Sequence, residues 1–312
     1  MPVFVSVGNV IVDLVMQVPA LPEPGGDVIA TGSQILVGGG LNTMVAAGRD
    51  GAQVRYAGMH GIGTFGDLVR DTLRQNNIQV VQAPFEGLDT GHCFAIVDAS
   101  GERTFVTHVG AEGQLTAEKL AAVDVVPGDT LFVSGYGLVH PVNARALTTW
   151  IPSVPDGVRV AADVGPLADA IDPDVLRVIL DRADVLTANR REALLIAPGA
   201  ELDRATADFA DRWNLLAVVR DGAAGCWVAP PGQEATQVEG FSVKALDTNG
   251  AGDAHDGVLL TALDHGLDPV RAARRANAAA AIAVTRTGPA TAPTTAEIDA
   301  FLSDRRRGIG EP

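Results

Sequence analysis

Much of the chain is organised around a glycine-rich segment that carries three aspartates and leads into an apolar run. It reads Asp247-Thr248-Asn249-Gly250-Ala251-Gly252-Asp253-Ala254-His255-Asp256-Gly257, followed by Val258-Leu259-Leu260-Thr261-Ala262-Leu263. Apolar side chains at 258, 259, 262 and 263 have helical spacing, so the turn is predicted to open a helix that stops near Gly266. The first amides of a helix lack partners within it and carry partial positive charge, which makes this turn a candidate phosphate-binding site.

Asp253 lies in the first turn of the predicted helix, beside the amides of Gly250, Ala251 and Gly252. A carboxylate against a phosphate site would repel the ligand if it were only structural. It can instead serve as a base that takes a proton from a hydroxyl about to attack the phosphorus. The alternative is that Asp253 is a helix N-terminal carboxylate stabilised by the helix dipole and that the glycines form only a tight turn. Short glycine motifs alone do not decide between the two.

The bulk composition narrows the function classes. The chain has 312 residues and is 47% hydrophobic, which allows a large core. A net charge of −15 argues against sequence-independent nucleic-acid binding, so the run Arg305-Arg306-Arg307 is interpreted as a solvated tail. Two cysteines, Cys93 and Cys226, give no disulfide framework and fit a reducing compartment. No apolar run approaches the roughly 18 residues of a membrane helix, and the first segment reads as a strand, not a signal peptide. We expect a soluble, cytoplasmic protein with no membrane partner.

The order of apolar runs predicts an α/β fold. Residues 3–8, 131–134 and 158–163 read as buried strands, and helical patterns lie between and after them. This rhythm predicts a doubly wound, mostly parallel central sheet flanked by helices. Partial alternation over 91–109, interrupted at Ser100-Gly101, indicates a hairpin.

Other nucleotide-binding motifs are disfavoured. Gly61-Ile62-Gly63-Thr64-Phe65-Gly66 matches the dinucleotide motif GxGxxG between a predicted strand (54–57) and a predicted helix (67–76). The acidic residue expected roughly 20 positions on is missing, because the next apolar run ends in Gln82. The only lysines, Lys119 and Lys244, lie in neither a P-loop nor a protein-kinase strand motif. Phosphate binding would therefore depend on backbone amides, arginines and a metal.

Two segments resemble the signatures of the ribokinase-like (PfkB-type) carbohydrate kinases. Residues 247–257 are similar to the C-terminal signature DTTGAGDxFxxG, with Asn249 and His255 as departures, and residues 38–51 are similar to the N-terminal signature, GGxxxN followed by an alanine-rich helix. Two further departures are Val37, where the family has its first glycine, and Gly63, where it has an aspartate. The resemblance runs from Gly8 to Gly288. It implies one ribokinase-like α/β domain over 1–312, with a small β-sheet lid formed by about 14–36 and 90–109.

The resemblance also implies an ATP- and Mg²⁺-dependent kinase in which Asp253 is the base and the amides of residues 250–252 hold the phosphoryl group. Substrate contacts would come from Asp13, Gly38, Gly39, Asn42 and Asp253, and nucleotide contacts from Asn189, Arg220, Gly222, Gly225, Thr248 and Asn277. Glu192 would hold Mg²⁺ through water. Asp247, with the loop 285–290, would place a monovalent cation such as K⁺.

From the residues alone, several of these side chains have structural alternatives. Asp13 is equally interpreted as a turn residue, Asn42 as a helix N-cap, and Asn189 with Glu192 as a capping pair. Asp163, at the end of a predicted strand, either faces the phosphates or forms a turn. Arg103 is interpreted as a solvated edge charge, the alternative being a contact with an anionic substrate.

The predicted activity is phosphoryl transfer from ATP to a primary hydroxyl of a free sugar such as ribose or fructose. Nucleoside kinases of the adenosine, inosine or pseudouridine type and sugar-phosphate kinases share these motifs, so their substrates are alternatives. A non-catalytic nucleotide- or sugar-binding protein is a second alternative, which ATP consumption with a substrate panel would discriminate. Exposed lid strands often pair between subunits, so a homodimer through the lid is a further expectation.

Overall fold

The computed structural model describes residues 2–307. Its body is a nine-stranded sheet in the order β13-β12-β11-β10-β9-β8-β1-β4-β5, in which only the β11–β12 and β12–β13 pairs are antiparallel. The strands are β1 (Val3–Ser6), β4 (Gln53–Tyr56), β5 (Gln79–Val80), β8 (Thr130–Ser134), β9 (Arg159–Asp163), β10 (Val185–Asn189), β11 (Leu216–Arg220), β12 (Gly225–Ala229) and β13 (Thr236–Glu239). The predicted mostly parallel α/β sheet is therefore confirmed.

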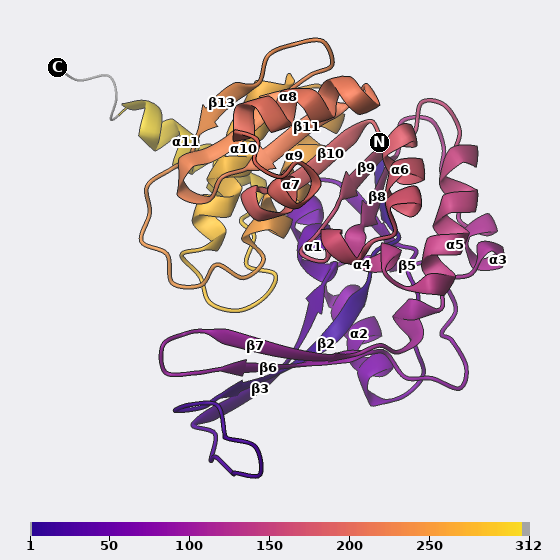
Figure 1. The fold of residues 1–312 in the computed structure, drawn as a ribbon, viewed down its shortest axis with the longest axis vertical. Helices are drawn as coiled ribbons and strands as arrows, with labels where there is room; N and C mark the ends of the chain where they lie inside the picture. Colours follow the sequence, from indigo (N-terminus) through magenta and orange to yellow (C-terminus); the bar gives the residue numbers. More distant parts are fainter. Residues whose placement is uncertain (1, 308–312) are drawn as a thin grey trace.

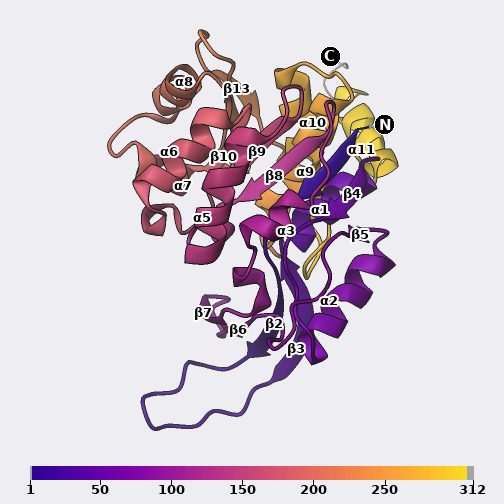
Figure 2. The ribbon, with the colours of Figure 1, turned by 90° about the vertical axis from the view of Figure 1, so that its right-hand side faces the viewer.

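Helices cover both faces of this sheet (Figure 2). Two hydrophobic cores lie between the helices and the strands. The helix residues of one core include Leu120, Leu147, Ile179 and Phe209. Those of the other core include Met44, Leu73 and Leu260. The α-helices are α1 (Leu41–Arg49), α2 (Thr64–Gln75), α3 (Ala117–Ala121), α4 (Gly135–Leu138), α5 (Pro141–Trp150), α6 (Pro173–Arg182), α7 (Arg190–Ile196), α8 (Leu202–Trp213), α9 (Ala251–Asp264), α10 (Pro269–Ala283) and α11 (Thr295–Arg307). Short 3-10 turns lie at η1 (Ala111–Gly113), η2 (Ile151–Ser153), η3 (Ala168–Ala170) and η4 (Gly222–Ala224).

The strand order reverses between β1 and β8. The chain builds β4 and β5 on one side of β1, then returns to add β8 through β11 on the other. Ligands of open α/β sheets bind outside the carboxyl ends of the strands at such a reversal. The final residues of β8, β9, β10 and β11 are Ser134, Asp163, Asn189 and Arg220, so polar side chains collect at this edge.

A second sheet lies below the body (Figure 1) and has the order β3-β2-β6-β7. Its strands are β2 (Val10–Gln17), β3 (Gly32–Gly39), β6 (His92–Val97) and β7 (Arg103–His108). The predicted hairpin is confirmed, with Gly101 at φ 84° in its turn. Strand β3 begins at Gly32, because its partner β2 ends at Gln17, which pairs with Gly32.

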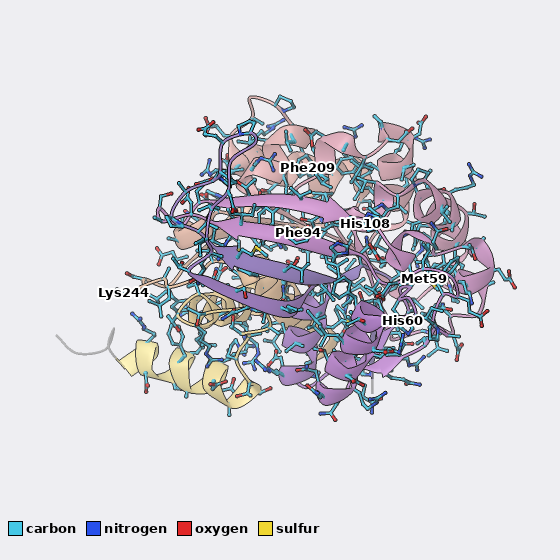
Figure 3. All side chains as sticks on the ribbon, turned by 90° about the horizontal axis from the view of Figure 1, so that it is seen from below. Met59, His60, Phe94, His108, Phe209 and Lys244 are labelled. Carbon is cyan, nitrogen blue, oxygen red and sulfur yellow. The ribbon has the colours of Figure 1, made fainter. Side chains whose placement is uncertain are left out.

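The two faces of this small sheet differ in character. Asp13 lies within β2, so its interpretation as a turn residue was wrong. It stands directly opposite Cys93 and beside Leu36, and these residues share one face, which we call the inner face. The adjacent row, Leu14, Phe94, Val106 and Ile35, lies on the outer face. Figure 3, which views the molecule from below, shows the small sheet in front with Phe94 and His108 on it.

Near the end of the chain, the expected tail is a helix. Arg305 belongs to α11, where its guanidinium donates to the carbonyl of Ser242 at 3.1 Å and lies over the ring of Phe301. Arg305 is exposed, as expected for a solvated charge, but it belongs to a helix and not to a tail. The side chains of Arg306 and Arg307 lie outside the described residues. Within the described chain, no helix is both long enough and apolar enough to cross a membrane.

Candidate active site

The glycine turn opens α9 as predicted. Gly250 precedes the helix at φ 71°, a left-handed conformation that glycine adopts without strain, and no side chain among the described residues caps this end. The first-turn amides of Ala251, Gly252 and Asp253 lack partners within the helix, although that of Ala251 donates to the Thr248 carbonyl at 3.3 Å. Such amides, together with the helix dipole, favour an anion, and here they lie at the edge where the strands terminate.

Asp253 is half-buried at this end and is held by two side chains of α1. One carboxylate oxygen accepts a hydrogen bond from the Thr43 hydroxyl at 2.7 Å, and the other accepts from the Asn42 amide at 3.4 Å. The N-cap of α1 is Gly40, so the interpretation of Asn42 as an N-cap was wrong. Its carbonyl oxygen instead accepts from the backbone amide of Ala290 at 2.7 Å.

Gly257 brings these two helices together. A methyl group at this position would lie 2.4 Å from the carbonyl oxygen of Thr43 and 2.7 Å from Cβ of Ala46. Only a glycine therefore lets α9 approach α1 closely enough for Asp253 to reach Thr43. The same helix places Ala254, Val258 and Leu259 in the core, which fixes the rotation of the helix.

The protonation of Asp253 is shifted by its surroundings. Burial raises the pKa of this carboxyl, the Thr43 hydroxyl lowers it, and the negative charge of Asp163 raises it again, with a net rise above the ordinary value. A raised pKa makes a carboxylate a stronger base. Tyr136, the second residue of α4, was not predicted from the sequence: burial and then the charges of Asp253 and Asp163 raise its pKa to about 12. The signal that could have found Tyr136 is its place just after a strand at the sheet reversal.

Arg220 lies behind the glycine turn within a cluster of carboxylates. Its guanidinium pairs with the fully buried Asp256, with Asp163 at 3.1 Å and with Glu192 at 3.7 Å. A methyl group on Gly252 would lie 3.5 Å from this guanidinium. Burial lowers the pKa of Arg220, but the three carboxylates together raise it above the ordinary value, so the group stays charged.

Asp163 has the most clearly shifted carboxyl group of the cluster. Burial raises its pKa to about 7, against the attraction of Arg220 and with the repulsion of Asp256. Its second oxygen accepts from the amide of Gly165 at 2.8 Å. The interpretation of Asp163 as a turn residue is therefore confirmed, and the other oxygen of the same carboxylate accepts from Arg220.

Asn189 and Glu192 form a capping box at the start of α7. The Glu192 carboxylate accepts from the Asn189 backbone amide at 2.7 Å, and the Asn189 side chain accepts from the Glu192 amide at 2.9 Å. The interpretation of Asn189 and Glu192 as a capping pair is thus confirmed. In the described part of the chain, no group of three or more His, Cys, Asp or Glu side chains is arranged to hold a metal directly. Mg²⁺ commonly keeps several waters and substrate phosphate oxygens as ligands, and an outer contact with Glu192 fits that chemistry.

On the small sheet, close contacts near Asp13 leave no room for a side chain at Gly38 or Gly39. A methyl group on Gly38 would lie 2.2 Å from an Asp13 carboxylate oxygen, and one on Gly39 would lie 2.6 Å from the carbonyl of Asn9. Gly39 also has φ 63°. Burial raises the pKa of Asp13 to about 6.

Three of the residues expected to contact the nucleotide, Gly222, Gly225 and Asn277, lie around β12 and α10. Gly222 and Gly225 have φ values of 55° and 99°, and a methyl group on Gly225 would meet the Val238 carbonyl at 2.1 Å. The Asn277 amide donates to the carbonyls of Val238 and Glu239 at 3.0 and 3.2 Å, so it holds β13 in place. Thr248 is exposed at the turn.

His255, one of the departures from the family signature, is buried under the turn. Neither of its ring nitrogens has a hydrogen-bond partner among the described residues. Burial and the charge of Arg220 lower its pKa to about 3, so the ring is neutral.

Arg103 forms an ion pair and is not a solvated edge charge. Its guanidinium pairs with the Asp247 carboxylate at 2.6 Å, which links the small sheet to the residue that begins the glycine turn. The interpretation of Arg103 as a solvated edge charge was therefore wrong.

The dinucleotide-like motif at 61–66 lies at a helix start whose amides are already bound by an acidic side chain of the protein. The amides of Phe65 and Gly66, at the start of α2, donate to the Asp89 carboxylate at 3.0 and 2.7 Å. The end of this helix is thus already neutralised, which agrees with the rejection of a nicotinamide site.

Comparison with known proteins decides the family. The model of the pfkB family of carbohydrate kinases matches residues 1–296. The chain belongs to this family. This pfkB carbohydrate kinase is 31% identical to the uncharacterized sugar kinase YegV of Escherichia coli, and the match covers 94% of this chain and 91% of that protein. It is 29% identical to the ribokinase of Haemophilus influenzae, over 95% of this chain and 96% of that protein.

The fold of this pfkB kinase is also that of solved ribokinases. The crystal structure of ribokinase from Thermotoga maritima superposes with a TM-score of 0.83 at 25% identity, covering 97% of this chain and 100% of that chain. The body and the small sheet are thus the ribokinase-like fold, and the protein is an ATP-using carbohydrate kinase.

Proposed function

We propose that this kinase transfers the γ-phosphoryl group of ATP to a primary hydroxyl of a free sugar such as ribose or fructose, with Asp253 as the base. The observation that carries the proposal is the placement of a half-buried carboxylate of raised pKa in the first turn of α9, beside the amides that would receive the phosphoryl group. A carboxylate at an anion site is explained by proton abstraction, since its charge otherwise opposes phosphate binding.

In this proposal, Thr43 and Asn42 orient the Asp253 carboxylate toward the attacking hydroxyl. Asp253 removes the hydroxyl proton as the sugar oxygen bonds to the γ-phosphorus and the bond to the β-phosphate oxygen breaks. The amides of residues 250–252 stabilise the charge on the transferring group, and Mg²⁺ supplies further charge neutralisation when bound. Asn189 and Glu192 would contact the hydrated ion. Arg220, Gly222, Gly225, Thr248 and Asn277 would form the nucleotide side, with Arg220 acting from behind the turn.

The sugar would lie between this edge and the inner face of the small sheet, which acts as the lid and excludes water. Asp13 would accept hydrogen bonds from sugar hydroxyls, with Gly38 and Gly39 giving the space that its carboxylate occupies. The other inner-face residues near Asp13, namely Cys93, Leu36 and Thr107, present little further charge. That favours a neutral sugar over a sugar phosphate.

We include a homodimer through the lid in the proposal. The outer face carries exposed Ile35, Val106, Phe94 and Met16, at 61, 61, 38 and 39% of their full exposure. In a homodimer, the small sheet of the second subunit would cover this apolar row and an edge strand.

A substrate panel tests the proposed acceptor. ADP release is measured with free pentoses and hexoses, with nucleosides and with sugar phosphates. We expect turnover with at least one free sugar to exceed that with every nucleoside by tenfold or more in kcat/KM. Preference for a nucleoside would replace the acceptor, and ATP binding without turnover on any member would favour the non-catalytic alternative.

The raised pKa of Asp13 predicts a pH effect on sugar affinity. Above about pH 6 the carboxylate is ionised and accepts hydrogen bonds strongly, and as the pH falls through 6 it becomes protonated, so the KM for sugar should rise. The Asp13→Asn variant should show a KM about 10- to 100-fold higher, as expected for loss of a hydrogen bond to a charged group, and a KM independent of pH between 5 and 7. The KM for ATP serves as the control and should stay within about twofold. A sugar KM of the wild type that is flat across this range would contradict the role.

A further inference from the structure

Asp247 is the residue for which the family resemblance implies a monovalent cation, but its carboxylate is already satisfied by the protein. One oxygen accepts from Arg103 Nη2 at 2.6 Å and from the Asn249 amide at 2.9 Å, and the other accepts from the Gly288 amide at 3.2 Å. The side chain of Asp247 retains 14% of its exposure. Three N–H donors and a full positive charge therefore surround the carboxylate that an ion would need.

This arrangement does not fit a bound monovalent cation. An ion at Asp247 would compete with the Arg103 guanidinium for the same oxygen and would be repelled by it at short range. The amides of Asn249 and Gly288 present hydrogens, not oxygens, to this carboxylate, whereas hard cations take oxygen ligands.

The position of Arg103 gives the ion pair a second consequence. Arg103 is the first residue of β7 and stands opposite Val97, which in turn stands opposite Gln17. Because residues alternate between faces, Arg103 lies on the same inner face as Asp13, which is four positions from Gln17 on β2. The pair therefore connects the sheet that would hold the sugar to the residue from which the phosphate-binding turn begins.

We propose that Arg103 is a built-in cation that replaces the monovalent ion at Asp247 and positions the glycine turn through it. Asp247 holds the Asn249 amide with the same oxygen that Arg103 contacts, so the guanidinium fixes the start of the turn whose next amides would bind phosphate. The kinase then needs no potassium, and the lid must be in place for the turn to be ordered. The positioning part of this inference rests on the proposed function, whereas the replacement of the ion does not.

Thermal unfolding tests the replacement without any sugar or nucleotide. The melting temperature of the full chain is measured in potassium chloride and in tetramethylammonium chloride at equal ionic strength, for wild type, Arg103→Gln and Arg103→Lys. A ligand that binds the folded state raises its stability, so an ion-specific shift reports binding. Wild type should show no difference between the salts. Arg103→Gln should melt lower in tetramethylammonium and recover part of the loss in potassium, and Arg103→Lys should behave more like wild type.

Glu102→Gln, a charge change at the exposed neighbouring residue of the same hairpin, is the matched control and should show no salt-specific shift. An equal potassium shift in wild type and Arg103→Gln would overturn the inference, and so would an Arg103→Gln variant with no potassium response. Kinetics add a second readout: kcat of wild type should change less than twofold with potassium, and that of Arg103→Gln should fall about tenfold and be partly rescued by it. Absence of sugar turnover would count against the proposed function and leave the melting test intact.

Discussion

Replacing Asp253 by asparagine is expected to lower kcat about a thousandfold while leaving the dissociation constant of ADP within about threefold of wild type. Loss of a positioned general base typically costs two to four orders of magnitude in rate, about 10²- to 10⁴-fold. The amide is nearly isosteric with the carboxylate and can still contact Thr43 and Asn42, so the turn should keep its shape. Steady-state kinetics and calorimetric ADP titration measure the two quantities.

The wild-type pH profile gives an independent reading of the same residue. Because the pKa of Asp253 is raised, kcat/KM should fall as the pH drops toward it, at a higher pH than an ordinary carboxyl would give. The residual activity of Asp253→Asn should lack this limb. Asp67→Asn is the matched control, since Asp67 is also an acidic residue in the first turn of a helix but is exposed and paired with Arg70. A tenth or more of the wild-type kcat remaining in Asp253→Asn would rule out the base.

Replacing Arg220 by methionine is expected to give the largest loss of stability of any single substitution in the site. Removing one partner of a buried ion pair leaves an uncompensated charge and typically costs about 3–5 kcal/mol. Arg220 is the shared partner of Asp256, Asp163 and Glu192, and Asp256 is fully buried. Urea unfolding monitored by circular dichroism measures the change.

The pH dependence of this loss has a defined sign. The pKa of Asp163 is about 7, above its unfolded value, so its protonated form favours folding: the contribution is complete below about pH 4 and is lost as the pH rises through 7. Without Arg220 the carboxylates should bind protons more readily still. The loss of unfolding free energy in Arg220→Met relative to wild type should therefore be smaller at pH 5.5 than at pH 8.

Two further variants serve as controls for this loss. Adding Asp256→Asn to Arg220→Met should restore part of the stability. Arg74→Met, which removes an exposed pair with Asp71, should change the stability little. A loss under about 1 kcal/mol at pH 8 would contradict a buried ion cluster that supports the turn.

What the sequence could predict was local. The apolar spacing after Gly252 predicted the helix that carries Asp253, and the apolar run over 158–163 predicted the strand that ends at Asp163. These signals depend on side chains a few positions apart, and family signatures added residues in the same short windows. The capping box of Asn189 and Glu192 was also readable from spacing alone.

What the sequence could not predict depends on pairing across the chain. Arg103 and Asp247 are 144 positions apart, and nothing near Arg103 distinguishes an ion pair from a solvated charge. Asn42 has the residue type of an N-cap, but helix packing through Gly257 turns it toward Asp253. Tyr136 follows a strand with no motif around it. Each of these contacts is set by tertiary packing, which overrides the local preference.

The most direct test of the central claim is the phosphorus NMR spectrum of the product formed from ATP and the preferred free sugar. Transfer to a primary hydroxyl predicts a phosphomonoester signal split into a triplet by the two protons of the hydroxymethyl carbon, collapsing to a singlet on proton decoupling. With Asp253→Asn that signal should be absent over the same interval. A doublet, from an ester at a ring or anomeric carbon, or release of inorganic phosphate alone, would contradict the account.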